Sequence, residues 1–240
     1  GWGHGLGLSQ YGAYGMALDG AKAGDIITHY YTGATAVSTS TNTAFRVGVE
    51  TAQTNIFVRG EDNPIDGGVA GNLTVAIEGG TTLTFAPMVE LNFTFTDSTF
   101  TLTASDTQTA SGTAATLSWN NTTTLLNLNA GTVASTALGA ATCSTTSCSH
   151  RYKYGTFSIK AKNAVNILRL NDEYLYGLGE MPSSWGVTAL EALKAQVIAA
   201  RSFAISRNTV RPACDCNVGV SDSDQVFLGF VKEVSTNGDR

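Results

Sequence analysis

The stretch Glu173-Tyr-Leu-Tyr-Gly-Leu-Gly-Glu180-Met-Pro-Ser-Ser-Trp185 is the part of the sequence on which both the fold and the function depend. Gly177 and Gly179 precede Glu180, and Pro182 follows it. Glycine gives the backbone unusual freedom, whereas proline fixes one of its two torsion angles. Such a run is too kinked for the interior of a strand or helix, so we expect Glu180 to lie on a tight turn.

A long helix is predicted directly after this turn, over residues 188–206. Thr188 and Glu191 have the spacing of a capping box, which marks a helix start. Apolar side chains recur on one face of this helix: Leu190, Leu193, Val197, Ala200 and Ala204. Ile198 and Ile205 make the opposite face apolar as well, so we expect the helix to be buried and to hold the turn in place.

Three motifs of the chain resemble those of one known family. The first combines Glu173-Tyr-Leu-x-Gly, Glu180-Met-Pro-x-x-Trp185 and Glu191-Ala-Leu-Lys-Ala-Gln-x-x-Ala-Ala-Arg201-Ser. The second is Gly1-Trp-Gly-His-Gly-Leu-Gly-Leu-Ser-Gln-Tyr-Gly-Ala13 with Ile27-x-x-Tyr30-Tyr31-x-Gly33, and the third is Asp224-Gln-Val-Phe-Leu-Gly229. Together they are similar to the SpoIID/LytB family of bacterial cell-wall proteins, and they leave residues 35–141 unexplained.

The resemblance implies a lytic transglycosylase that cleaves peptidoglycan glycan strands at N-acetylmuramic acid and leaves 1,6-anhydro ends. It assigns the role of single acid and base to the glutamate of Glu-Met-Pro, here Glu180. Ordinary glycosidases use two carboxylates, but Asp172 and Glu173 are typical of the exposed start of an element. Without the motif, a solvated glutamate on a turn is the commoner interpretation of Glu180.

Several other side chains are candidates for binding the sugar. These candidates all lie in the three motifs, and they are polar side chains together with one tyrosine: His4, Ser9, Gln10, Tyr11, Arg201 and Gln225. Ser9 also fits the cap of a helix, and most aromatic rings belong to cores. Arg201 needs a partner on a buried helix, and an ion pair with Asp222 or Asp224 explains it equally well.

The chain departs from the family pattern in two ways. Only Leu178 and Gly179 separate Gly177 from Glu180, so the loop is two residues shorter than the family form. The glycine-rich motif also precedes the glutamate motif instead of following it. We therefore expect a permuted arrangement, in which the two ends of the chain meet and residues 1–11 share a cleft with Glu180.

Composition limits the classes of protein to consider. The 240 residues are 42% hydrophobic and only 14% charged, with a net charge of −5 and no basic run. The chain can bury a sizeable core, and nucleic acid is an unsuitable partner. No apolar stretch reaches the roughly 20 residues of a membrane span. The sequence opens inside a motif without a signal peptide, so we expect a processed or truncated piece of an extracellular or cell-wall protein.

The four cysteines form two close pairs, Cys143 with Cys148 and Cys214 with Cys216. Local disulfides of a secreted protein are the favoured interpretation, although four cysteines allow three pairings. Zinc is the alternative, with His150 beside Cys148, but the spacings are not those of standard zinc fingers. We expect neither a metal nor a cofactor.

Residues 44–141 alternate apolar and polar side chains between turn signals. Eight strands are expected, over residues 45–50, 55–59, 73–78, 82–85, 89–96, 99–104, 116–119 and 125–128. They predict an antiparallel β-sandwich or barrel that serves as scaffold, with carbohydrate binding as the alternative. The alternation should direct Phe93, Phe95, Phe100 and Leu102 into one core.

The two ends of the chain predict the rest of an α+β fold. Ser9 and Asp25 are candidate caps of two N-terminal helices. Strands are expected at 151–164, 164–170 and 225–231. We therefore expect a SpoIID-like core from residues 1–43 and 142–240, with residues 44–141 as an inserted subdomain.

Two other functions remain compatible with the sequence. The LytB side of the family includes amidase enhancers, so the chain could bind the wall or a cell-wall amidase without cutting glycan. The threonine-rich middle segment also suits a structural protein of a surface layer.

Overall fold

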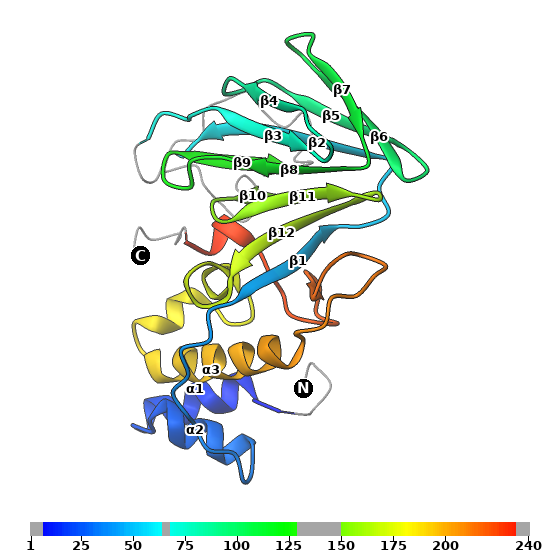
Figure 1. The fold of residues 1–240 in the computed structure, drawn as a ribbon. Helices are drawn as coiled ribbons and strands as arrows, with labels where there is room; N and C mark the ends of the chain where they lie inside the picture. Colours follow the sequence, from blue (N-terminus) through cyan, green and yellow to red (C-terminus); the bar gives the residue numbers. More distant parts are fainter. Residues whose placement is uncertain (1–6, 64–67, 129–149, 234–240) are drawn as a thin grey trace.

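The computed structural model describes residues 7–63, 68–128 and 150–233, and within them two β-sheets face each other above a layer of helices (Figure 1). One sheet has the order β13-β1-β12-β11-β8-β3-β4 and the other β10-β9-β2-β5-β6-β7. The first comprises β1 (Ala44–Glu50), β3 (Leu73–Ile77), β4 (Thr82–Phe85), β8 (Ala114–Ser118), β11 (Thr156–Lys160), β12 (Asn163–Arg169) and β13 (Val218–Gly219). The second comprises β2 (Asn55–Asp62), β5 (Leu91–Thr96), β6 (Thr99–Ala104), β7 (Thr109–Gly112), β9 (Thr124–Leu128) and β10 (Arg151–Tyr152).

Side chains from both sheets form the main core. Phe93, Phe95, Phe100 and Leu102 are all buried in it, and the ring centroids of Phe93 and Phe100 lie 5.2 Å apart. The intervening threonines of β5 and β6 face solvent, as strand alternation requires. The α+β class and the sandwich-like arrangement are therefore confirmed, and the described strands close no barrel.

The strand pairing crosses the expected segment boundaries. β1 pairs with β12, with Phe45 opposite Leu168, and β8 pairs with β11, with Ala115 opposite Ile159. The segment 44–141 thus shares a sheet with the segment 142–240. The division into 1–43, 44–141 and 142–240 stays a prediction about organisation.

Three helices form a second layer below β1 (Figure 1). They are α1 (Gln10–Leu18), α2 (Ala23–Tyr30) and α3 (Leu190–Ser206). Five alanines, two isoleucines and one methionine make up their shared core: Ala13, Ala23, Ile26, Ile27, Met181, Ala189, Ala192 and Ala195. Because alanine is short, the helix axes can approach closely.

The buried face of α3 differs from the predicted one. Leu190 is 51% exposed and Val197 39% exposed, whereas Ala192, Ala195 and Ala200 are buried. The predicted face was therefore right for Ala200 and Ala204, which are buried, and wrong for Leu190 and Val197, because short alanines contact the neighbouring elements.

The helix starts were predicted with mixed success. Ser9 caps α1, and its hydroxyl accepts a hydrogen bond from the Gly12 N–H at 3.2 Å. Asp25 lies within the first turn of α2 instead of at its cap, and accepts from the Lys22 N–H. The capping box of α3 does not form, because Glu191 accepts the Ala23 N–H of α2 at 2.9 Å.

Short helical turns connect β12 to α3. They are the π-helical turn η2 (Leu170–Tyr174) and the 3-10 turns η3 (Leu175–Gly177) and η4 (Ser183–Gly186). The expected strand at 225–231 was wrong: its end forms the 3-10 turn η5 (Gly229–Glu233). Gly229 has φ +64°, a left-handed conformation that ends an extended segment.

A buried charge cluster lies in the second sheet. Glu61 forms ion pairs with Arg59 and Arg151, both at 2.7 Å, and accepts a hydrogen bond from Asn127. Burial alone would raise the pKa of Glu61, but the Asn127 hydrogen bond and the two guanidinium groups hold this pKa below its ordinary value.

Candidate functional site

The loop that carries Glu180 is bound to residues 225–229 by backbone hydrogen bonds. The Gly179 N–H donates to the Val226 carbonyl at 2.8 Å, and the Leu228 N–H donates to the Gly177 carbonyl at 2.8 Å. Between these bonds, the Val226 N–H donates to Oε1 of Glu180 at 2.8 Å. The carboxylate is therefore oriented by the backbone of a segment 46 residues away in the chain.

Both glycines of this loop are required by close packing. A Cβ at Gly177 would lie 2.3 Å from the ring of Phe227, and one at Gly179 would lie 2.5 Å from Leu228. Real Cβ atoms do not approach other atoms so closely. The sequence Gly-Leu-Gly thus allows the loop to contact the segment 225–229 directly.

A buried aromatic stack supports the loop from below. The rings of Tyr174 and Phe227 stack with centroids 5.5 Å apart, and the Tyr174 hydroxyl donates to Oε1 of Gln225 at 2.7 Å. Burial raises the pKa of Tyr174 far above its ordinary value, and the nearby carboxylates of Glu180 and Asp224 raise it further. Gln225 is itself buried and acts here as a support of the loop.

Glu180 lines a pocket of about 200 Å³ between its own loop and α3. The wall is mostly apolar and includes Leu175, Tyr176, Leu178, Met181, Leu193 and Val197, with the polar residues Ser183, Gln196 and Lys232. The exposed Val197 and the half-buried Leu193 are thus explained, because both face this pocket. Among the residues described, none donates a hydrogen bond to the second oxygen of Glu180.

Lys232 places a cation in the same pocket. It belongs to η5, and its Nζ donates to the carbonyl of Met181, the residue after Glu180, at 2.9 Å. Burial lowers the pKa of Lys232. Sequence reasoning missed this residue, since a single lysine in Phe-Val-Lys-Glu carries no motif.

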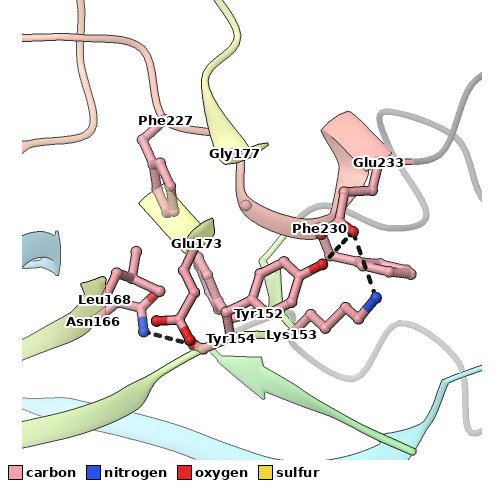
Figure 2. Close-up of a pocket in the computed structure, with 11 residues that line it drawn as sticks. Tyr152, Lys153, Tyr154, Asn166, Leu168, Glu173, Gly177, Phe227, Phe230 and Glu233 are labelled. Atoms are coloured by element: carbon pink, nitrogen blue, oxygen red, sulfur yellow. Dashed lines mark hydrogen bonds and ion pairs between the residues drawn. The ribbon is translucent and has the colours of Figure 1, made fainter. Parts of the chain in front are cut away.

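A second, much smaller cavity lies behind the loop (Figure 2). Its volume of about 10 Å³ is the size of one water molecule. The Tyr154 hydroxyl donates to Glu233 at 2.7 Å, and Lys153 lies 3.5 Å from the same carboxylate. Burial and Glu233 raise the pKa of Tyr154 to about 12, so its hydroxyl stays protonated and donates to Glu233 at neutral pH.

Glu173 also lines this small cavity, and its predicted exposure was wrong. It is only 6% exposed, and its carboxylate accepts the Arg169 N–H at 2.7 Å and contacts the Arg169 guanidinium at 3.3 Å. Asp172 is exposed, as expected.

The N-terminal helices pack beside the residues that follow Glu180. The ring of Trp185 lies 5.2 Å from that of Tyr11 and 4.6 Å from that of Tyr14. The Tyr14 hydroxyl also contacts the Thr188 hydroxyl at 3.3 Å. Two distant parts of the chain therefore meet, although Tyr11, at 79% exposure, does not line the Glu180 pocket.

The other expected sugar-binding residues have separate surroundings. Ser9 and Gln10 lie at the start of α1, outside the lining of the pocket. Arg201 donates from Nε to Asn171 at 2.7 Å and from a terminal nitrogen to the Thr41 carbonyl at 2.8 Å. Its contacts link α3 to η2 and to the segment before β1, and it pairs with neither Asp222 nor Asp224.

Arg211 is the partner of Asp224. Its guanidinium lies 2.7 Å from Oδ2 of Asp224, which also accepts the Gly219 N–H at 2.7 Å. These contacts hold the turn that leads directly into Gln225 and Val226.

The structure tests only some of the predictions made for the cysteines and for metal binding. Cys214 and Cys216 form a disulfide, with Cα atoms 5.1 Å apart. Cys143, Cys148 and His4 lie outside the described residues, so their predicted roles stay predictions. Within the described ranges, no three His, Cys, Asp or Glu side chains gather as metal ligands, and His29 packs against Tyr30.

Residues 158–239 match the protein-family model SpoIID, described as Stage II sporulation protein. This match is consistent with the resemblance of the motifs to the SpoIID/LytB family. The SpoIID segment includes β12, the Glu180 loop, α3 and the supporting residues 225–229. Neither the curated proteins nor the solved structures gave a match to the chain.

The SpoIID match indicates a role related to sporulation and the cell wall. It covers two of the three motifs, those of Glu180 and of Gln225, whereas residues 1–33 lie outside it. The helices described in the chain include none that is long and apolar enough to cross a membrane.

Proposed function

We propose that this chain is a peptidoglycan lytic transglycosylase that acts outside the cell, with Glu180 as its single acid and base. The observation that carries the proposal is the setting of this carboxylate. One oxygen is fixed by the Val226 N–H, and the side chain lines an apolar-walled pocket next to α3. A positioned carboxyl group in a partly dehydrated pocket is suited to general acid–base catalysis.

The reaction balances with one carboxyl group. Glu180 in its acid form donates its proton to the glycosidic oxygen, and the bond from C1 of muramic acid to that oxygen breaks. The resulting carboxylate then takes the proton of the muramic 6-hydroxyl while the 6-oxygen forms a bond to C1. The product is a 1,6-anhydro sugar, no water is consumed, and the acid is restored.

The single-carboxylate requirement agrees with the surroundings of Glu180. No second Asp or Glu belongs to the described lining of the pocket. Glu173, the nearest acid in the motif, is engaged with Arg169 on the other side of the loop. A hydrolase that activates water with a second carboxylate is therefore disfavoured.

Cleavage of defined glycan strands tests this proposal. We expect wild-type protein to produce anhydro-muramic ends, detected by mass spectrometry, and Glu180→Gln to lose at least about 100-fold in rate. Glu78→Gln, an exposed carboxylate in a turn of the first sheet, is the matched control and should retain full activity. Unchanged cleavage by Glu180→Gln would overturn the assigned role.

A non-catalytic enhancer of a cell-wall amidase is the alternative within the same family. Val187 and Leu190 are exposed apolar residues beside the site and suit contact with a protein partner. Stimulation of an amidase by Glu180→Gln, without any anhydro product from the wild type, would favour this alternative.

A further inference from the structure

Lys232 is a cation in the pocket with no role in the proton transfers described above. This residue lines the same 200 Å³ pocket as Glu180 and is half-buried. Its one hydrogen bond goes to the Met181 carbonyl, at 2.9 Å. An ammonium group has three donors, so two remain for another acceptor.

Within the part of the chain that the structure describes, this cation has no ion-pair partner. Among the described residues, none of the ion pairs within 4.0 Å involves Lys232, whereas Lys153 and Lys194 each pair with a glutamate. Holding a positive charge in a partly buried site without a carboxylate within ion-pair distance is costly. The lowered pKa of Lys232 reflects this cost, and a bound anion would offset it.

We propose that Lys232 is a specificity-determining residue that binds a carboxylate on the glycan next to the bond being cleaved. The inference rests on the proposed function in naming a glycan as the ligand. A muramic sugar carries a carboxylate in its lactyl group, whereas a strand of N-acetylglucosamine alone carries none. The pocket therefore selects an acidic saccharide over a neutral one of the same length.

The position of Lys232 allows it to distinguish these sugars without taking part in the chemistry. The Met181 carbonyl that holds its ammonium group belongs to the residue after Glu180, so cation and acid have a fixed relation. A charge-assisted hydrogen bond from this site would align the acidic sugar against Glu180. The other polar lining residues, Ser183 and Gln196, are neutral and cannot provide that charge.

Binding measurements on the Glu180→Gln protein test the inference without cleavage. Calorimetry would compare three ligands: a tetrasaccharide of alternating N-acetylglucosamine and muramic acid with free lactyl groups, the same saccharide carrying stem peptides, and chitotetraose. We expect the free lactyl saccharide to bind at least about tenfold more tightly than chitotetraose, as for a hydrogen bond to a charged group. Preferred binding of only the peptide-bearing saccharide would place the recognised carboxylate on the peptide.

Substitutions then assign the preference to Lys232. In the Glu180→Gln protein, the additional change Lys232→Met should make the affinities for the free lactyl saccharide and for chitotetraose equal. Lys232→Arg should keep most of the preference for the free lactyl saccharide. Lys160→Met, an exposed lysine on β11, is the control and should change nothing. Circular dichroism and thermal melting verify that each variant is folded.

The results separate this inference from the proposed function. An unchanged preference in folded Lys232→Met would overturn the role of Lys232 even if the wild type cleaves glycan. Equal binding of acidic and neutral saccharides by Glu180→Gln would overturn it as well. A preference that depends on Lys232, in a protein that cleaves nothing, would support the inference and reject the transglycosylase.

Discussion

The backbone N–H of Val226 donates a 2.8 Å hydrogen bond to Oε1 of Glu180. This bond joins two of the three motifs that resemble the SpoIID/LytB family. Two neighbouring residues have separate roles here: the backbone N–H of Val226 orients the carboxylate, and the ring of Phe227 packs into the core beneath it. The position of the acid thus depends on the contact between the loop and this segment.

The two glycines of the loop should tolerate alanine unequally. Gly177→Ala places its Cβ against the ring of Phe227, which is held between Tyr152 and Tyr174 and cannot move aside. We expect a loss of about 1–3 kcal/mol in the free energy of unfolding, typical of an overpacked core. Gly179→Ala meets the more exposed Leu228 and should cost less.

Urea unfolding of both variants measures this difference. Gly24→Ala in α2 is the control, because a Cβ there has no neighbour within 4 Å. It should be neutral or stabilise the protein by up to about 1 kcal/mol, since alanine favours helix over glycine. A larger loss for Gly179→Ala than for Gly177→Ala would contradict the packing described here.

Replacing Arg201 should reduce stability and leave catalysis intact. Arg201→Met removes charged hydrogen bonds to Asn171 and to the Thr41 carbonyl, so we expect a loss of about 2 kcal/mol. Thermal unfolding and cleavage by the folded fraction would be measured together. Arg207→Met, at the exposed end of α3, should change both very little.

The opposite result for Arg201 is equally informative. Reduced glycan cleavage with unchanged stability would show that this side chain contacts substrate, as the motif alone suggested.

Glu61 should make the stability of the protein depend on pH in the acidic range. Its pKa in the folded protein lies below the ordinary value of 4.5. The stabilisation is therefore complete above about pH 4.5 and is lost as the pH falls through the lower, folded-state pKa. Thermal melts of the wild type between pH 7 and pH 3 should show this decline.

Substitution separates Glu61 from other acids that titrate in this range. Glu61→Gln leaves Arg59 and Arg151 without this carboxylate and should cost about 3 kcal/mol at pH 7, with a flatter pH profile. Glu90→Gln, whose exposed carboxylate also pairs with Arg59, should cost at most about 1 kcal/mol. Equal costs for the two variants would argue against the buried cluster as the source.

The alanine face of α3 should not accept larger side chains. Ala192 is fully buried between α3 and the N-terminal helices, so Ala192→Leu should cost about 1–3 kcal/mol. Ser202→Leu, on the exposed side of the same helix, should cost far less. If Ala192→Leu proves neutral in differential scanning calorimetry, α1 and α2 do not pack on α3 as described.

The strands were predictable because their signal is local. Apolar and polar side chains alternate around Phe93, Phe95, Phe100 and Leu102, and this pattern indicates which side of each strand faces the core. All eight strands expected between residues 45 and 128 form. β7 was missed, since Thr-Ala-Ser-Gly carries no large apolar side chain. Strand order could not be predicted, because it depends on contacts between distant segments.

The candidate site was predictable only where a motif marks it. Glu180 on a glycine-rich turn was expected, but the wall of its pocket was not. Leu193 and Val197 have the same apolar pattern as core residues, although they line the pocket. Lys232 reaches the site only through the turn at Gly229, which replaced an expected strand.

The sheet pairing limits how this protein can be divided for experiments. The family match begins within β11, yet β11 is bonded to β8 and β12 is bonded to β1, both encoded well upstream. A recombinant fragment restricted to residues 158–239 would expose two unpaired strand edges and the alanine face of α3 to water. Such a fragment should aggregate, so work on Glu180 needs the longer polypeptide even though the motif itself is short.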